Sequence, residues 1–412
     1  MKSLRTFTTL ITGMWLALAS GQIYDVTPGE ITICASSPIS EGKVPTAQDY
    51  DQLIDCGFNA GIGSGTVQYF LDQFKLIGHR NFKYFVNSSE FLKRDVEFFK
   101  SYVKALGKDP HLAGWVFKDE PAFSDLNQLQ VKYNEFRNAD PDHVLFMNLV
   151  GVFETAYAGN LKSFPAYLNY IQEKFNPYFW SYDYYPIIVK NGKLQVIYDQ
   201  FYPDLEDFHA ISKKTDKPFW NFSESMQYST KWYSRPAATE AYLRWEAFNS
   251  LAYGAQGICY WTYGMRSSHN NEKYISALVD MNGRKTKAWY AAQKVNSEIK
   301  KFNDVFYGCE VTDVRHTGSK IYTRTKRLSG RFGPFRMVRS GDSGVVVSLI
   351  KNKGSEYAVV VNRDVLASQK VSMDLNPNKS VSDLTDGGKE YNWRATMNFT
   401  LNPGDYRIFK IK

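Results

Sequence analysis

Two groups of acidic residues each follow an apolar segment that has the length of a β-strand. Asp119 and Glu120 come just after residues 112–117, and Glu224 comes just after residues 218–222. A carboxylic acid can protonate a leaving oxygen while an ionised carboxylate acts on the neighbouring carbon, and glycoside hydrolysis uses such a pair. The sequence therefore predicts that two carboxyl groups act on one bond, provided that the fold brings the two segments together.

Both acidic groups also have a structural explanation. Asp119 as the N-cap of a helix, with Glu120 in its first turn, is the alternative for the first group. A loop carboxylate held by neighbouring serines is the alternative for Glu224. Pro121 favours the chemical interpretation, because a residue that precedes proline is held in an extended conformation. We therefore expect Glu120 to point out of its strand end.

Aromatic and polar side chains gather where two further strands should end, in residues 179–186 and 260–263. Flat aromatic faces stack on sugar rings, and polar groups such as the Asp183 carboxylate bond to sugar hydroxyls. Core packing is the alternative for any single ring, and we expect Trp261 and Tyr184 at the mouth of the fold. The predicted substrate-binding residues are Asp119, Asn148, Asp183, Tyr184, Tyr185, Trp220 and Trp261.

Strand-like and helix-like segments alternate through most of the chain. The expected strands cover residues 31–36, 59–62, 82–86, 111–117, 143–149, 179–184, 218–222 and 257–262. The expected helices cover residues 47–55, 67–77, 89–106, 126–137, 236–253 and 286–306. Eight strands over about 270 residues predict an α/β fold, the (β/α)8 or TIM barrel. A doubly wound sheet is the competing architecture, but the first strand lacks the glycine-rich turn that such a sheet usually carries.

A barrel of this kind would bring the two acidic groups together. Catalytic residues of TIM barrels lie at the carboxyl ends of the strands. Strands four and seven are three places apart in a ring of eight, so Glu120 and Glu224 should face each other across the mouth. A carboxyl separation of about 5 to 5.5 Å predicts retention of configuration, and one of about 6.5 to 9.5 Å predicts inversion.

The pattern changes near residue 308, where short alternating segments separated by Gly, Asn and Asp turns replace the longer units. Such segments are typical of an antiparallel β-sandwich. We therefore predict three parts of the chain: a signal peptide over residues 1–21, a catalytic barrel over residues 22–306, and a small sandwich domain over residues 307–412.

The positive charge of the protein is concentrated in the last part of the chain. The formal net charge is +8, and residues 301–412 hold 19 basic against 11 acidic residues, which accounts for all of it. Overall basicity therefore does not indicate nucleic acid binding. Between Arg315 and Arg339 the basic residues stand without an acid after position 315. A solvated hairpin face is one interpretation, and a patch that contacts acidic glycans or lipid headgroups is the other.

The amino-terminal segment is typical of an export signal. Lys2 and Arg5 precede an apolar run over residues 10–18, and small residues follow it. This run is too short for a permanent membrane span, so we expect cleavage near Ser20 or Gln22 and a periplasmic or extracellular location. No cysteine stands at the expected cleavage site, which argues against a lipoprotein anchor.

The four cysteines and six histidines do not form a recognisable metal-binding or redox motif. Cys34, Cys56, Cys259 and Cys309 are scattered without CxxC spacing, and no HExxH is present. Export permits disulfides, but buried structural thiols fit the apolar surroundings of Cys34 and Cys259 better. We therefore expect neither a metal nor an organic cofactor.

Residues 114–263 resemble the clan A glycoside hydrolases. The resembling segments are GWVFKDEP (114–121), SYDYYP (181–186), KPFW (217–220), RP (235–236), RW (244–245), LAYGAQGI (251–258) and YWTY (260–263). The chain looks like exported Bacteroides-type glycosidases that are distantly similar to family 42 beta-galactosidases. The resemblance implies a retaining glycosidase for beta-linked sugars, with Glu120 as acid/base and Glu224 as nucleophile. It also implies that Trp261 is a platform for the cleaved sugar, and that Tyr184 or Tyr185 bonds the nucleophile.

One position departs from the clan A pattern. Members of the clan usually carry Asn before the acid/base, and this chain carries Asp119. An acid there would either bond a sugar hydroxyl or raise the pKa of Glu120 through like-charge proximity. This departure, together with a loose motif around Glu224, keeps a second hypothesis open, namely a catalytically inactive carbohydrate-binding protein on the same scaffold.

Overall fold

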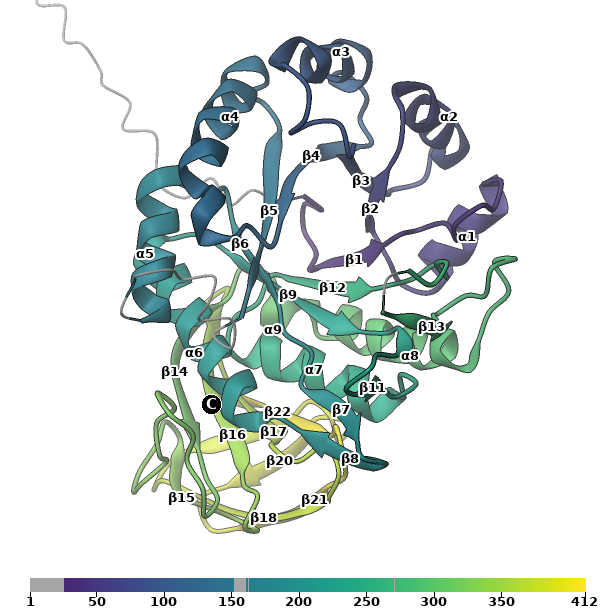
Figure 1. Ribbon diagram of the computed structural model, residues 1–412. Coiled ribbons are helices and arrows are strands. Elements are labelled where there is room, and N and C mark those ends of the chain that lie inside the picture. The colour runs from purple at the N-terminus through teal and green to yellow at the C-terminus, as the bar shows by residue number, and fades with distance from the viewer. Residues whose placement is uncertain (1–25, 152–160, 162, 270) are drawn as a thin grey trace, which may run out of the picture.

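Eight parallel strands close into a barrel, which confirms the predicted fold class (Figure 1). The computed structural model describes residues 26–412 apart from 152–160, 162 and 270. In order around the barrel, the strands are β1 (Thr32–Ser36), β12 (Gly257–Trp261), β9 (Phe219–Glu224), β6 (Trp180–Asp183), β5 (Val144–Val150), β4 (Leu112–Asp119), β3 (Lys83–Asn87) and β2 (Ala60–Ser64). The predicted signal peptide, residues 1–21, lies outside the described residues.

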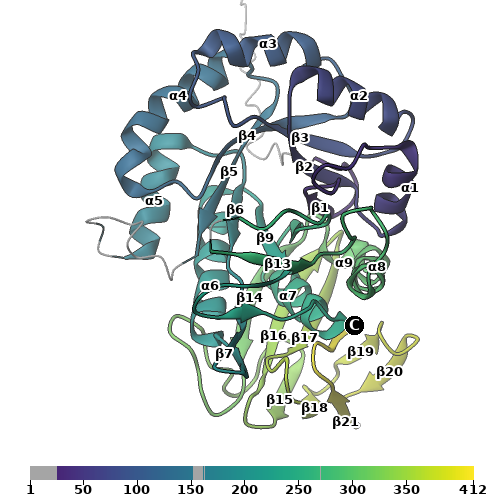
Figure 2. The ribbon, with the colours of Figure 1, turned by 45° about the vertical axis from the view of Figure 1, so that its right-hand side comes forward.

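Helices cover the outer face of the barrel, as Figure 2 shows for α1 to α5. They are α1 (Ala47–Asp55), α2 (Val67–Ile77), α3 (Val96–Leu106), η1 (Phe123–Asp125), α4 (Leu126–Ala139), α5 (Phe164–Phe175), α6 (Tyr198–Thr215), α7 (Glu240–Ala252), α8 (Lys287–Lys301) and α9 (Asn303–Phe306). Helix α3 begins seven residues later than predicted, because Asp95 caps it by accepting the N–H of Phe98 at 3.2 Å. Within the described residues, no helix has both the length and the apolar character that a bilayer span requires.

Aromatic side chains fill the inside of the barrel. Trp220 of β9 stacks on Phe179, with ring centroids 4.3 Å apart, and meets Phe85 and Phe146 edge-on or tilted at 5.8 and 6.2 Å. Strand β5 is buried along its whole length, because one face of it meets these rings and the other meets the helices. The barrel interior is therefore a packed core rather than a channel.

A five-stranded antiparallel sheet is built from the loops that follow β6, β9 and β12. In spatial order its strands are β13 (Lys273–Ser276), β10 (Gln227–Ser229), β11 (Ser234–Arg235), β7 (Ile187–Lys190) and β8 (Lys193–Val196). A separate apolar cluster of Met226, Tyr228, Tyr274 and Ala277 supports it. The sheet was not predicted, and it orders the loops on one side of the barrel mouth.

From Glu310 onward the chain forms two further antiparallel sheets that share an apolar core, as a sandwich requires. The six-stranded sheet has the order β14 (Glu310–His316), β16 (Val345–Asn352), β17 (Ser355–Asn362), β22 (Tyr406–Ile411), β19 (Ser380–Asp383) and β20 (Lys389–Asn392). The three-stranded sheet has the order β15 (Phe335–Ser340), β18 (Gln369–Leu375) and β21 (Thr396–Leu401). The exact division at residues 306 and 307 stays a prediction.

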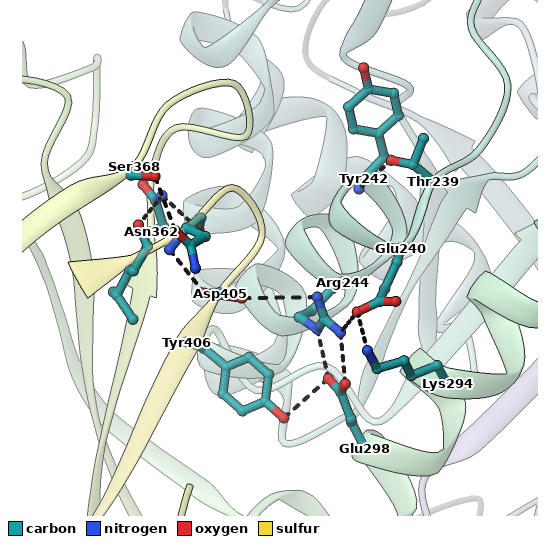
Figure 3. A network of polar contacts seen from close by, with 12 residues as sticks. Thr239, Glu240, Tyr242, Arg244, Lys294, Glu298, Asn362, Ser368, Asp405 and Tyr406 are labelled. Atoms are coloured by element: carbon teal, nitrogen blue, oxygen red, sulfur yellow. Dashed lines mark hydrogen bonds and ion pairs between the residues drawn. The ribbon is translucent and has the colours of Figure 1, made fainter. Parts of the chain in front are cut away.

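The sandwich packs against helix α7 through a group of polar and aromatic contacts (Figure 3). Arg244 of α7 binds both carboxylate oxygens of Glu298 on α8, through Nε and Nη2 at 2.7 Å each, and also contacts Glu240. Tyr406 of β22 donates to Glu298 at 3.3 Å, and its ring stacks on Phe248 with centroids 3.6 Å apart. These contacts fix α7 between the barrel and the sandwich.

Candidate active site

A cavity of about 1260 Å³ opens at the carboxyl ends of the barrel strands, where a barrel of this type carries its active site. Seven of the nine predicted site residues line it: Asp119, Glu120, Asn148, Asp183, Tyr184, Tyr185 and Trp261. Residues of the five-stranded sheet, including Tyr228 and Arg235, line the same cavity. Glu224 lies behind this lining, and Trp220 lies in the barrel core.

Three neighbouring strand ends share one polar network in this cavity. The Asn148 amide, at the end of β5, donates to Asp119 of β4 at 3.2 Å and to Asp183 of β6 at 2.9 Å. Its carbonyl oxygen accepts the hydroxyl of Ser181 at 2.8 Å, which fixes the orientation of the amide. Both carboxylates are therefore held by one buried side chain rather than by separate loops.

The two carboxyl groups of this network favour their protonated forms more than free carboxyl groups do. Burial raises the pKa of Asp183 well above its usual value, and the nearby Glu120 and Asp119 raise it further. Burial also raises the pKa of Asp119, against the opposing effect of the Asn148 hydrogen bond. Three acids thus crowd one wall of the cavity, and like-charge repulsion adds to the effect of burial on the pKa of Asp183.

Glu120 stands at this wall in a left-handed backbone conformation, with a φ of 45°. The extended conformation that we expected from Pro121 is therefore wrong. The Glu120 N–H continues the pairing of β4 with β5 by donating to the Asn148 carbonyl at 2.9 Å, after which the chain turns toward η1. A positive φ in a residue with a side chain costs about 1 to 3 kcal/mol, and such residues are enriched at functional sites as well as in turns. Glu120 is exposed and lines the cavity.

Glu224 ends strand β9 beneath the cavity lining. Its side chain is 7% exposed, and its Oε2 lies 3.7 Å from Nε of Arg235 without forming a hydrogen bond. Oε1 accepts the N–H of Met226 at 3.1 Å. Burial raises the pKa of Glu224 well above its usual value, although the Arg235 guanidinium acts in the opposite direction. In the barrel register Glu224 pairs with Trp261, which does line the cavity.

A second glutamate, which sequence reasoning missed, supports Glu224 from below. Glu246 of helix α7 is 2% exposed, and its Oε2 accepts the backbone N–H of Glu224 at 3.0 Å. Burial raises the pKa of Glu246 to about 8, against opposing hydrogen bonds from the Glu224 backbone and the Ser223 side chain. The signal in the sequence was an acid between the apolar residues Trp245 and Ala247 of a predicted helix.

Arg235 was also missed as a site residue, although it stood in one of the resembling segments. It comes from β11, and its Nη1 donates to the carbonyl oxygens of Ile187, at 3.1 Å, and of Tyr185. Its guanidinium lies 5.7 Å from the centroid of the Tyr185 ring. The five-stranded sheet therefore delivers the one cation that is paired with Glu224 among the described residues.

The predicted aromatic residues divide between the cavity and the core. Tyr185 and Trp261 line the cavity with nearly parallel rings whose centroids are 6.0 Å apart. Tyr185 also hydrogen-bonds Asp183, which lowers the pKa of that carboxyl. The hydroxyl of Tyr184 donates to Gln200 on α6. Burial raises the pKa of Tyr185 well above its usual value, and the charges of Asp183 and Glu224 raise it further.

Trp220 does not reach the cavity. Its side chain is 1% exposed and fills the barrel interior beside Gly257, where even a Cβ atom would lie 2.3 Å from the indole. The expectation that Trp220 contacts a sugar is therefore wrong, because its position in the strand points it inward below the level of the mouth.

The four cysteines have free thiols, three of them buried and Cys309 partly buried. Cys34 and Cys259 are neighbours in the register of β1 and β12. Within the described part of the chain, no three His, Cys, Asp or Glu side chains are grouped so that they could hold a metal ion.

The basic stretch between Arg315 and Arg339 lies on the sandwich side of the molecule, and several of its cations have partners inside the protein. Arg324 pairs with Asp207 of helix α6. Arg315 binds Asp313 at 2.7 Å, and Arg327 donates to two backbone carbonyls. Part of this charge therefore serves internal contacts.

Known glycosidases share both sequence features and the fold of this chain. Residues 125–302 match the family model of glycoside hydrolase family 42, described as beta-galactosidase. The match includes Glu224 and Trp261 and begins after Glu120. No curated protein matches the chain in sequence.

Solved glycosidase structures superpose on nearly the whole chain. A beta-galactosidase from Bacillus circulans has a TM-score of 0.63 at 8% identity, covering 93% of this chain and 99% of its own. A family 42 beta-galactosidase from G. stearothermophilus, solved as a catalytic mutant, has a TM-score of 0.60 at 10% identity, with coverage of 94% and 99%. A family 5 glycoside hydrolase from Bacteroides vulgatus has a TM-score of 0.55 at 11% identity, with coverage of 92% and 88%. The chain has the fold of these glycosidases, and it is distantly similar to family 42 beta-galactosidases.

Proposed function

We propose that this protein is a glycoside hydrolase that cleaves beta-linked sugars with retention of configuration. Glu120 acts as general acid/base and Glu224 as nucleophile. The observation that carries the proposal is the placement of these two glutamates at the ends of β4 and β9, three places apart in the barrel, with Glu120 lining the cavity and Glu224 beneath its lining. The similarity to family 42 supports the same reaction class.

The surroundings of the two glutamates suit different tasks. Glu120 reaches the cavity and stands near Asp183 and Asp119, so it can exchange protons with a substrate and with water. Glu224 is enclosed, and Arg235 at 3.7 Å is the charge that favours its ionised form. Positive charge that develops on the sugar ring in the transition state adds to this effect. The ionised form of the buried Glu224 side chain is therefore favoured most in the transition state, where it acts as the nucleophile.

Removal of each carboxyl group tests the assignment. Glu120→Gln should lower kcat/KM by about 10² to 10⁴ on glycosides with poor leaving groups. The loss should be much smaller on dinitrophenyl glycosides, whose leaving group needs no proton. Glu224→Ala should abolish turnover of both substrate types. Glu90→Gln is the matched control, because Glu90 follows β3 but does not line the cavity.

The stereochemistry and the residue roles can be refuted separately. Proton NMR of the first sugar released should show the starting anomer, and the opposite anomer would rule out retention. Near-normal hydrolysis by the Glu120 or Glu224 variant would rule out the assigned role of that residue.

A second function, carbohydrate binding without hydrolysis, has one observation in its favour. Oε2 of Glu224 is buried and accepts no hydrogen bond, and Arg235, 3.7 Å from it, lines the cavity whereas Glu224 does not. Calorimetric binding of beta-linked oligosaccharides, with no product from any of them, would favour this function over hydrolysis.

Export and an acidic-glycan contact are two further proposals. We propose that residues 1–21 direct export to the periplasm or the medium, and amino-terminal sequencing of the mature protein should find a start near Ser20 or Gln22.

We also propose that the stretch from Arg315 to Arg339 contacts acidic polysaccharide. Retention on polygalacturonate should then fall as salt rises, and retention that ignores salt would refute the contact.

A further inference from the structure

A tryptophan stands at the rim of the cavity, at the tip of the hairpin that joins β10 to β11. Trp232 is 65% exposed, and of the exposed large hydrophobic side chains in the described residues it alone lines the cavity. A single exposed hydrophobic residue needs no explanation on a protein surface. What distinguishes Trp232 is the backbone structure that holds it in place and the aromatic and charged groups that lie beside it.

The hairpin is ordered without help from the indole ring. The Thr230 hydroxyl oxygen accepts the backbone N–H groups of Trp232 and Tyr233, each at 3.1 Å, and the Thr230 N–H donates to the Tyr233 carbonyl at 2.8 Å. Below the turn, Tyr228 pairs with Arg235 in the strand register. The backbone therefore holds Trp232 in place while its ring remains open to solvent.

Aromatic rings lead from the candidate cleavage site toward this tip. The Tyr228 ring meets Trp261 edge-on, with centroids 5.6 Å apart. The Arg235 guanidinium lies 5.0 Å from the centroid of the Tyr233 ring, next to Trp232 in the chain. One short hairpin thus carries the partner of Glu224 at its base and an open indole at its tip.

The size and charge of the cavity limit what can reach both places. Its volume of about 1260 Å³ exceeds the roughly 300 to 1,000 Å³ of pockets for drug-sized ligands. Acids and cations both line it, and they include Asp119, Glu120, Asp183, Lys43, Arg235 and Arg266. The cavity therefore suits a polar chain that extends beyond one or two sugar rings.

We infer that Trp232 stacks on a sugar ring outside the cleavage site, and that the substrate is a beta-linked oligosaccharide. The cleavage part of this inference rests on the proposed hydrolase function, whereas the binding part does not. Stacking at the rim adds contact area for a long substrate and adds none for a monosaccharide with a small leaving group.

The test compares Trp232→Ala with Trp393→Ala. Trp393 is an exposed residue of the sandwich, away from the cavity. A cation lies over each of the two indole rings, Arg394 over Trp393 and Lys231 over Trp232, so Trp393 is a matched control. The probes are beta-1,4-linked tetrasaccharides of galactose, glucose, mannose and xylose, and the nitrophenyl monoglycosides of the same sugars. Melting temperatures establish that the variants are folded.

The Trp232→Ala variant should lose about tenfold more kcat/KM on the best tetrasaccharide than on its monoglycoside, and Trp393→Ala should lose nothing. Trp232→Phe should recover part of the loss. Equal losses on both substrate types would overturn the inference. If the wild-type protein hydrolyses none of them, the hydrolase proposal fails, and calorimetry decides the binding part. About tenfold weaker tetrasaccharide binding by Trp232→Ala then supports it, while unchanged affinity or no binding by the wild-type protein overturns it.

Discussion

Glu246 offers a sharp test of how the candidate nucleophile is held. Its carboxyl is 2% exposed and accepts the backbone N–H of Glu224 at 3.0 Å. Glu246→Leu leaves this buried N–H without a partner, which should lower the free energy of unfolding by about 1 to 3 kcal/mol. Glu246→Gln keeps a carbonyl oxygen at the same place and resembles the protonated acid. The Gln variant should lower the free energy of unfolding by less than about 1 kcal/mol near pH 6.

The pH dependence of stability should separate the two forms of Glu246. Its pKa is about 8 in the folded protein, against an ordinary value of 4.5. The folded state therefore holds a proton that the unfolded chain releases, so stability falls as pH rises from 4.5 to about 8 and is level above that. At about 1.4 kcal/mol per pH unit, the total loss is on the order of 4 to 5 kcal/mol. Glu246→Gln removes this loss.

Urea unfolding between pH 5 and pH 9 measures this difference directly. The Glu246→Gln protein should gain stability relative to wild type as pH rises, and most of the gain should be complete by about pH 8. Glu97→Gln, a change on the exposed face of α3, serves as the control and should run parallel to wild type. Parallel curves for wild type and Glu246→Gln would refute the buried proton. Equal stability of the Leu and Gln variants would refute the hydrogen bond.

Three further changes probe the interface, the acidic wall and the barrel core. Arg244→Met leaves Glu298 without its bidentate partner, so the free energy of unfolding should fall by about 3 kcal/mol; an unchanged melting temperature would contradict the role of this pair. Asp119→Asn removes a charge that raises the pKa of Asp183, so the limb that Asp183 contributes to a carboxyl-carbon NMR titration should move to lower pH. A limb that stays in place would remove Asp119 from the electrostatics of the site. Trp220→Phe should lower the melting temperature and leave KM unchanged, since Trp220 is a core residue; a raised KM would restore it to the site.

Elements whose signals are local could be predicted from the sequence. Helices α1 and α2 have the predicted bounds, because an apolar face and a threonine before the first turn both mark their beginnings. The barrel followed from the repetition of such units. The placement of Asp119 and Asn148 at one mouth followed in turn, because the carboxyl ends of parallel strands must meet there.

Features that depend on distant parts of the chain could not be predicted. Strand β11 is two residues long, so no alternation marks it, and the position of Arg235 depends on its pairing with β7 and β10. Glu246 stands between apolar residues of a helix, but the sequence does not reveal that its carboxylate meets the backbone of Glu224 on a distant strand. The φ of Glu120 departs from what Pro121 favours because pairing with β5 continues through its N–H.

Helix α7 connects the sandwich to the candidate active site. Side chains two residues apart on a helix point about 200° apart, so Arg244 and Glu246 face opposite ways. Arg244 meets Glu298, which also receives the hydroxyl of Tyr406 from the sandwich, while Glu246 supports the backbone of Glu224. Every residue from Leu243 to the end of the helix is buried. A helix on the outside of a bare barrel would leave one side in water. The sandwich covers that side of α7, so it contributes to the position of this helix, and through Glu246 to that of Glu224, without lining the cavity.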